Sequence, residues 1–287
     1  MRSADFAYQG WYPYDNKTCR REIEGFQKKA KKISIEHIKK KGGIVPHAGW
    51  FFSGVLAFSV LYNLIGDHKT DTIIMVGKHS NQEEYSSRRN TIMLSGEWET
   101  PFGPLNIDEE IAGLINDKHG LQVETEEDYE FDNTVELQLP FIKYLCPETK
   151  IVPLGVVERS KKSLKIGETI GDIIKRSDKS IKIIGTTDMT HYGPGYGFTP
   201  QGYGENAVRW VTDVNDKRMI DLFLGLKADD ILEESSRNYN CCCPVAVATA
   251  LTALRALGVH KGYLVDYYTS YSVRPSSDFV GYAGVIY

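Results

Sequence analysis

The fold is decided by a short stretch, GIVPHAG at residues 43–49, in which an apolar run meets a proline and a histidine. The uncharged, apolar segment at residues 55–65 that follows is typical of a buried helix. A β-branched run then occupies residues 72–76 and stops at Gly77. A strand, a helix and a second strand in this order indicate an α/β fold.

The same alternation continues to the end of the chain. Further strands are predicted at residues 151–157, 181–184, 263–271 and 279–286, and further helices at 107–116, 134–145, 161–176, 205–224, 228–234 and 245–257. Because no segment has the composition of a linker, we expect a single domain over residues 1–287. The predicted class is α/β, with a central, mostly parallel sheet and helices on both faces.

Composition excludes several classes of protein. The 287 residues include 34 Lys and Arg against 38 Asp and Glu, a net charge of −4, so the chain lacks the basic surface of a nucleic-acid binder. The uncharged stretches at residues 50–66 and 241–254 fall short of the ~20 residues that span a membrane. Five cysteines, three of them adjacent, make a poor disulfide framework. We therefore expect a soluble, reduced, cytoplasmic protein with no membrane or nucleic-acid partner.

Histidines follow three of the predicted strands. His47 follows the first strand, His79 follows the strand at residues 72–76, and His191 follows the strand at 181–184. Ligands of α/β sheets bind at the carboxyl ends of strands, so we expect one shared site. Two imidazoles with one anionic ligand form the open site of non-haem Fe(II) proteins. The residues leave three candidates for that anion, namely Asp188, Glu136 and a cysteine thiolate.

Two of these candidates also have purely structural interpretations. Glu136 lies at the start of the predicted helix 134–145, for which Thr134 is the candidate N-cap, and its carboxylate can simply stabilise that helix. The cysteines at residues 241–243 precede Pro244, which suits the first turn of a helix. A thiol at a helix N-terminus has a lowered pKa and is a better ligand, whereas three small buried residues are the alternative. The Gly- and Tyr-rich loop that follows His191, up to residue 204, is long enough to be functional.

Six motifs together carry a family resemblance. They are GWYP at residues 10–13, IVPHAGWFFSG at 44–54, ETPFG at 99–103, NTVELQLPF at 133–141, DMTHYG at 188–193 and CCCPV at 241–245. In this order they cover essentially the whole chain. The chain thereby resembles the Memo family, whose fold is similar to that of class III extradiol ring-cleaving dioxygenases of the LigB type.

The resemblance implies a metal site made of two histidines and a cysteine, the cysteine standing where the ring-cleaving enzymes use glutamate. Transferred to this sequence, the ligands are His47, His79 and Cys241, with Cys242 as the alternative. His191 is then the acid/base, with Asp188 beside it, and Glu136 completes the candidate catalytic group. Fe(II) is the expected metal, and copper or zinc are alternatives.

The chain departs from the family pattern at two places. Relatives read Gly-Pro-Ser/Asn-His after the second strand, whereas this chain reads Gly-Lys-His at residues 77–79. The histidine arrives one residue early and a lysine replaces the proline, so the direction of His79 stays open. Relatives read Cys-Gly at the cysteine motif, where this chain has three cysteines followed directly by Pro244.

Two classes of function follow from these residues. The first is a metal-dependent redox enzyme with dioxygenase-like chemistry on a small substrate, with an aromatic compound as candidate, bound under the tyrosine-rich loop at residues 192–204. The alternative is a non-catalytic scaffold on an enzyme-derived fold that binds a peptide or another partner. A third possibility is sequestration of the metal without turnover.

Overall fold

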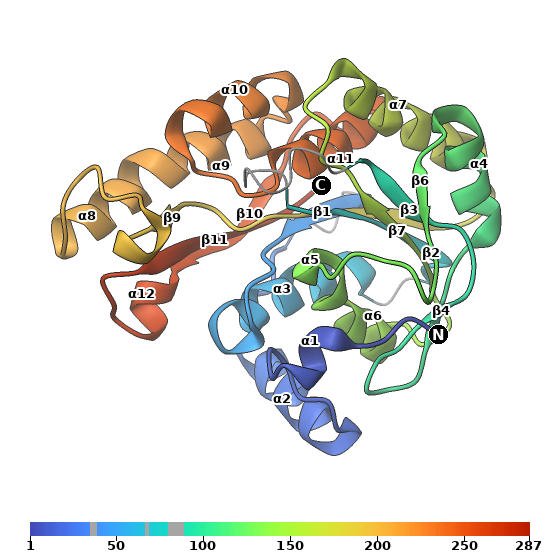
Figure 1. Ribbon diagram of the computed structural model, residues 1–287, viewed down its shortest axis with the longest axis horizontal. Coiled ribbons are helices and arrows are strands. Elements are labelled where there is room, and N and C mark those ends of the chain that lie inside the picture. The colour runs from blue at the N-terminus through green and yellow to red at the C-terminus, as the bar shows by residue number, and fades with distance from the viewer. Residues whose placement is uncertain (35–38, 67–68, 80–88) are drawn as a thin grey trace.

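The computed structural model describes residues 1–34, 39–66, 69–79 and 89–287. Within these ranges nine strands form one sheet in the order β10-β11-β1-β8-β2-β7-β3-β6, and β9 pairs with β11 outside this path (Figure 1). Their bounds are β1 (Gly42–Val45), β2 (Thr72–Gly77), β3 (Thr91–Met93), β6 (Gln122–Glu124), β7 (Lys150–Gly155), β8 (Ile181–Thr186), β9 (His191–Tyr192), β10 (Tyr263–Thr269) and β11 (Phe279–Ile286). A separate two-stranded sheet contains β4 (Glu97–Trp98) and β5 (Leu105–Asn106).

The centre of the large sheet is parallel. β1, β8, β2 and β7 run in the same direction, while β11 is antiparallel to β1 and β3 is antiparallel to β7. Val45 pairs with Thr186, and Val76 pairs with Gly185, so the carboxyl ends of β1, β8 and β2 are level. The predicted α/β class with a central, mostly parallel sheet is therefore confirmed. Antiparallel strands flank the parallel centre on both sides.

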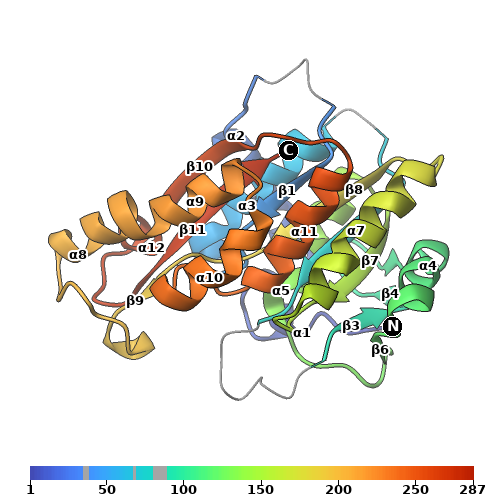
Figure 2. The ribbon, with the colours of Figure 1, turned by 90° about the horizontal axis from the view of Figure 1, so that it is seen from above.

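Helices cover both faces of this sheet, as predicted (Figures 1 and 2). On one face α11 (Pro244–Ala256) packs on β8 and β2, with α7 (Lys161–Arg176), α9 (Asp216–Leu224) and α10 (Ala228–Asn238) around it. On the other face α3 (Trp50–Ile65) packs on β1 and β11, with α6 (Leu139–Leu145) and α2 (Asn16–Lys29) against it. Both α3 and α11 are buried on nearly every side, which explains their continuous apolar sequences.

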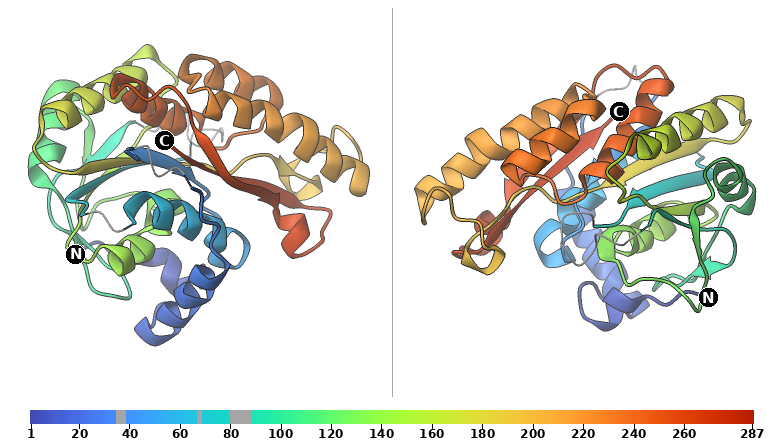
Figure 3. Two further views of the ribbon diagram at one scale, coloured as in Figure 1. Left: turned by 180° about the vertical axis from the view of Figure 1, so that it is seen from behind. Right: turned by 45° about the horizontal axis from the view of Figure 1, so that its top comes forward.

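One end of the molecule extends beyond the layers. β10 and β11 continue outward together with α8 (Glu205–Trp210) and α12 (Ser270–Val273), as the view from behind and the tilted view both show (Figure 3). Among the described residues no helix combines the length and apolar character needed to cross a bilayer.

Two predicted helices are interrupted. The helix expected at residues 134–145 divides into α5 (Asn133–Glu136) and α6, because Pro140 has no N–H to donate to the carbonyl of Glu136. Its N-cap is Asp132, whose side chain accepts a hydrogen bond from the Thr134 N–H, and not Thr134 itself. The helix expected at 205–224 contains a π-helical turn, Val211–Asn215, between α8 and α9.

Several elements were not predicted. They are α1 (Asp5–Tyr8), α2, the short strands β3 and β6 at one side of the sheet, the β4–β5 pair, β9 and α12. Each is short or strongly polar, so its hydrophobic pattern is weak. The helix α4 (Glu109–His119) begins after its N-cap Asp108, whose side chain accepts a hydrogen bond from the Ile111 N–H.

Candidate metal centre

The level carboxyl ends of the central strands bring the predicted histidines together. His47 follows β1 and His79 follows β2. Cys242 and Cys243, directly before α11, add two thiols. Among the described residues, the ligand atoms of His47, His79, Cys242 and Cys243 all lie within 4.8 Å of one another. Metal–ligand bonds of about 2.0–2.3 Å require separations of this order. We call these four residues the His/Cys group.

His47 is held rigidly from both sides of its backbone. Its N–H donates to Asp188 Oδ1 at 2.8 Å, and its carbonyl accepts from Asn133 Nδ2 at 2.7 Å. The side chain is 1 % exposed, and its Nε2 lies 3.2 Å from Cys242 Sγ. The other ring nitrogen, Nδ1, is buried and has no hydrogen-bond partner among the described residues. A buried imidazole with a free nitrogen next to a thiol suits a metal ligand.

His79 is oriented by a carboxylate. Its Nδ1 and its backbone N both lie 3.3 Å from Asp132 Oδ2. The centroids of the His79 and His47 rings are 4.9 Å apart, and the His79 side chain is 26 % exposed. A carboxylate on the distal nitrogen of a histidine is a common second partner in metal sites, because it fixes the tautomer and the ring direction. The structure thus directs His79 into the His/Cys group, a point that the sequence left open.

Cys242 is the cysteine that faces the histidines. Besides His47, its Sγ contacts Cys243 Sγ at 3.7 Å and accepts the backbone N–H of Asp188 at 3.2 Å. Cys241, which its position favoured, points elsewhere: its Sγ lies 3.2 Å from Thr187 Oγ1, and it is outside the group found among the described residues. The geometry therefore supports the alternative, Cys242, and places Cys243, the third cysteine of the run at 241–243, in the same group.

Electrostatics favour a thiolate at Cys242. Burial by itself raises the pKa of this thiol, but the hydrogen bond from Cys243 and the charge of His47 outweigh it and hold the pKa well below its usual range. Burial lowers the pKa of His47, while the negative charges of Cys242 and Asp188 raise it further than burial lowers it. Burial raises the pKa of Cys241, which stays a neutral thiol. The thiolate is the form that binds metals, so Cys242 is prepared for that role.

A cleft of about 700 Å³ opens over the two histidines. Its walls include the aromatic side chains of Trp11, Phe52, Tyr196 and Tyr282, and Arg274 and Asp278 lie along it. The rings of His191 and Tyr196 are 5.0 Å apart, edge to face. Of the tyrosines in the loop at residues 192–204, Tyr196 alone is among the described residues that line this cleft. Tyr192 instead stacks on Phe279 in a separate small core.

The candidate acid/base residues lie in the same cleft. His191 and Asp188 both line it, and Asp188 also holds the backbone of His47. Asp188 is almost fully buried, and burial raises the pKa of its carboxyl, while the neighbouring His47 lowers it again in part. The structure thus brings His191, Asp188, His47 and His79 around one space, as the strand-end argument predicted.

Glu136 occupies a different place. It is not among the described residues that line the cleft, and its Oε1 accepts the Phe6 N–H at 2.7 Å and the Tyr12 hydroxyl at 3.0 Å. These contacts tie the N-terminal segment to α5. Burial raises the pKa of this carboxyl to about 7. These contacts give Glu136 a tethering role, which differs from both the catalytic role and the helix-stabilising role considered for it from the sequence.

The raised pKa of Glu136 makes a prediction about stability. Between pH 4.5 and about 7 the unfolded chain ionises this group while the folded chain keeps the proton, so the free energy of unfolding falls as pH rises through that window. Glu136→Gln keeps an oxygen that can accept both hydrogen bonds and removes the titration. We expect the difference in free energy of unfolding between the variant and the parent protein to shift by about 3 kcal/mol in favour of the variant between pH 4.5 and pH 8.

Urea unfolding at both pH values measures this difference. Glu168→Gln, at an exposed glutamate, is the matched control. Its free energy of unfolding relative to the parent should be the same at both pH values. A stability difference between Glu136→Gln and parent that is the same at both pH values would show that the buried carboxyl does not titrate in this window.

Asp132 and the cleft residues after β10 were not predicted from the sequence. Asp132 could have been predicted as an N-cap, because it is the polar residue directly before the start of α5. Its side chain accepts the backbone N–H of Thr134, two residues later. Arg274 and the other cleft residues after β10 carried no sequence signal, because they reach the cleft only through the pairing of β10 with β11.

Comparisons with known proteins agree with this architecture. The family model described as Memo-like protein matches residues 2–286. A MEMO1 family protein of Thermococcus onnurineus is 30 % identical over 256 residues, covering 87 % of each chain, and one of Methanococcoides burtonii is 28 % identical over 280 residues, covering 96 % of each. The crystal structure of the uncharacterized protein JW3007 from Escherichia coli K12 matches with a TM-score of 0.53 at 10 % identity, over 86 % of this chain and 99 % of that one, and so shares the fold. The extent of the family match and the identity to these relatives show that the chain belongs to the Memo family.

Proposed function

We propose that this protein binds a transition-metal ion through His47, His79 and Cys242 and uses it in redox chemistry on a small molecule. One observation carries the proposal: the imidazoles and a thiol with a lowered pKa converge within 4.8 Å at the edge of a cleft of about 700 Å³. Sites for small molecules are commonly clefts of this size with a few convergent polar groups.

The donor set supports iron, copper or zinc. Imidazole suits all three, and thiolate adds preference for softer ions over magnesium or calcium. Fe(II) is the first candidate because two histidines and one anion, with an open side toward the cleft, form its usual site in oxygen-using proteins. A bound iron or copper ion would supply one-electron redox chemistry beside the cleft. Asp132 and Asp188 hold the two histidines in place before any metal arrives.

The walls of the cleft support a small, flat substrate. Trp11, Phe52 and Tyr196 offer aromatic surfaces, which favour an aromatic compound as the first candidate. His191 is placed to donate or accept a proton at a substrate held in this space, with the Asp188 carboxylate near it. The protein residues thus bind and orient the substrate, and hold a proton near it.

Metal analysis after anaerobic purification, followed by oxygen uptake with a panel of catechols, tests the proposal. We expect about one equivalent of iron or copper per chain and uptake that stops when a chelator removes the metal. Tight metal binding with no substrate-dependent uptake would point to sequestration instead. A protein that binds no metal, or a partner captured equally well by a variant lacking His47, His79 and Cys242, would favour the scaffold function.

A further inference from the structure

The residue before His79 has an unusual backbone. Lys78 adopts a φ of 87°, in the left-handed region that residues with a Cβ rarely occupy. It is also only 3 % exposed, although lysine is almost never fully buried without a partner. Such a conformation persists only when the surrounding contacts hold it. The question is which contacts do so at this position.

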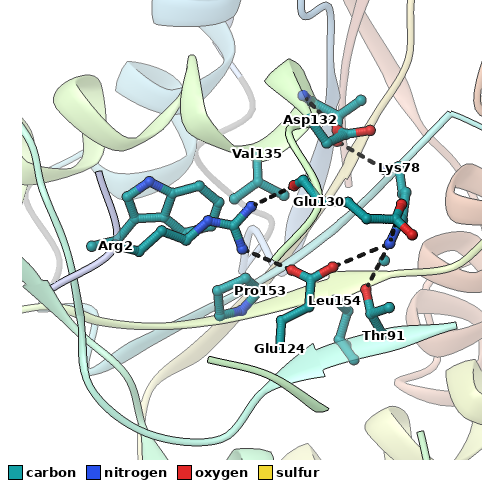
Figure 4. A pocket seen from close by; sticks show the side chains of 12 residues that line it. Arg2, Lys78, Thr91, Glu124, Glu130, Asp132, Val135, Pro153 and Leu154 are labelled. Atoms are coloured by element: carbon teal, nitrogen blue, oxygen red, sulfur yellow. Dashed lines mark hydrogen bonds and ion pairs between the residues drawn. The ribbon is translucent and has the colours of Figure 1, made fainter. Parts of the chain in front are cut away.

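The far end of the lysine is held by three groups, as Figure 4 shows. Lys78 Nζ lies 3.1 Å from Glu124 Oε1 and 3.0 Å from Glu130 Oε2, and donates to Thr91 Oγ1 at 3.3 Å. A buried ammonium that lost these partners would be strongly unfavourable, so the position of Nζ is well determined.

The carboxylate partner is itself fixed. The second oxygen of Glu124 accepts from Arg2 Nη1 at 2.7 Å, and Arg2 Nη2 donates to the Glu130 carbonyl at 3.0 Å. The Arg2 guanidinium lies between the rings of Trp98 and Tyr129, at 3.7 and 4.2 Å from their centroids. The anchor of Lys78 is therefore a network of two cations and two carboxylates, buried at Arg2 and Lys78, largely buried at Glu124 and partly exposed at Glu130, visible together in Figure 4.

The sheet leaves room for the lysine stem. Gly155 ends β7 and pairs with Gly77, the last residue of β2. A Cβ at Gly155 would lie 2.6 Å from Lys78 Cδ and 2.4 Å from Thr91 Oγ1. The absence of a side chain at residue 155 thus lets the lysine pass over β7 to reach its anchor.

The near end of the lysine is joined to the histidine through α5. The Lys78 N–H donates to Thr134 Oγ1 at 2.8 Å, and the Thr134 hydroxyl donates to Asp132. Asp132 in turn holds both the backbone and the ring of His79. Because the backbone at residue 78 is left-handed, Lys78 and His79 can both face the start of α5.

We propose that Lys78 is a positioning residue for His79: its ion pairs with Glu124 and Glu130 hold the left-handed turn that directs the histidine into the His/Cys group. This inference rests on the proposed metal site. It extends that site by assigning a specific role to a buried cation that touches none of the proposed ligands through its side chain.

Zinc affinity, measured by competition with a chromophoric chelator, tests the role of Lys78. Lys78→Met keeps the stem and removes the charge, and we expect zinc to bind about 10- to 100-fold more weakly, the usual effect of losing a supporting partner. Lys78→Arg, which keeps the charge, should restore most of the affinity. Lys182→Met is the matched control, because Lys182 is also buried but lies at the start of β8, at the amino ends of the parallel strands and away from the His/Cys group. It should change the zinc affinity less than about twofold.

Two further measurements separate positioning from general damage. In the metal-free protein, the ring protons of His79 should give one set of NOEs to the His47 ring, 4.9 Å away between centroids, in the parent and in Lys182→Met, and weakened, exchange-broadened NOEs in Lys78→Met. If Lys78→Met does not fold, Glu130→Gln removes one ion pair at a partly exposed residue and should show the same loss of zinc affinity to a smaller degree.

Parent-like zinc affinity and parent-like His79 signals in whichever of these variants folds would overturn the proposal. Failure of the metal site itself gives a different result, because the parent would then bind zinc no better than His47→Ala. The NOE measurement of the His79 ring position still tests the role of Lys78 in that event, since it needs no metal.

Discussion

Replacing His47 with alanine should weaken zinc binding at least about 100-fold, more than the loss of any supporting partner. His47 is 1 % exposed, its Nε2 lies 3.2 Å from Cys242 Sγ, and its backbone is fixed at both ends, so no other described side chain can take its place without a shift of β1. Chelator competition measures the change. His260→Ala, at an exposed histidine outside the group, is the control and should bind zinc as the parent does.

The same chelator competition, applied to alanine variants of the three adjacent cysteines, tests which cysteine is the third ligand. Cys242→Ala should match the loss seen for His47→Ala, because Cys242 is the thiol beside the histidines. Cys241→Ala should leave affinity nearly unchanged, because its Sγ is directed to Thr187. Cys243→Ala distinguishes a three-ligand site from a four-ligand site. If Cys241→Ala abolished binding and Cys242→Ala did not, the arrangement described above would be wrong for the metal-bound protein.

The second large effect is expected at His191. His191→Gln should lower turnover about 10²- to 10⁴-fold, the usual contribution of a general acid or base, and leave the metal content unchanged. Glutamine keeps hydrogen-bonding capacity but cannot exchange a proton near neutral pH. His191 lines the cleft but lies outside the His/Cys group found among the described residues, which is why the two readouts should separate.

Oxygen uptake and metal analysis on the same preparation check this separation. His119→Gln, at the end of α4 and away from the cleft, is the control and should keep parent turnover. Loss of metal together with turnover would make His191 a ligand. Unchanged turnover would remove it from the proton-transfer step.

Much of the fold was predictable because its core elements carry strong local patterns. The strands β2 and β8 are short runs of β-branched and apolar residues, and α3 and α11 are long uncharged segments, so each pattern reflects burial directly. The strands β3 and β6 have three residues each, too few for a period to appear. The π-helical turn could not be predicted for another reason. Asn215, its last residue, and Asp216, the next residue, both form hydrogen bonds with Thr190, which lies in a distant part of the chain.

The residues of the site likewise fall into those that the sequence predicts and those that it cannot predict. Histidines at three strand ends predicted convergence because parallel strands place their carboxyl ends at one edge, whatever the intervening sequence. The choice among the three adjacent cysteines could not be made, because neighbouring residues at a helix start point in different directions and only packing against His47 and Thr187 decides which thiol faces the site.

The sequence by itself determined the class of fold, the end of the strands at which the histidines gather and the presence of His47, His79 and His191 there, since these depend on local hydrophobic pattern and on the direction of strands. Only the tertiary structure decided that Cys242 faces the histidines, that Glu136 tethers the N-terminal segment, and that Asp132 orients His79. Each of these is a contact between side chains from separate elements. Such contacts are set by angstrom-scale packing, which no local pattern encodes.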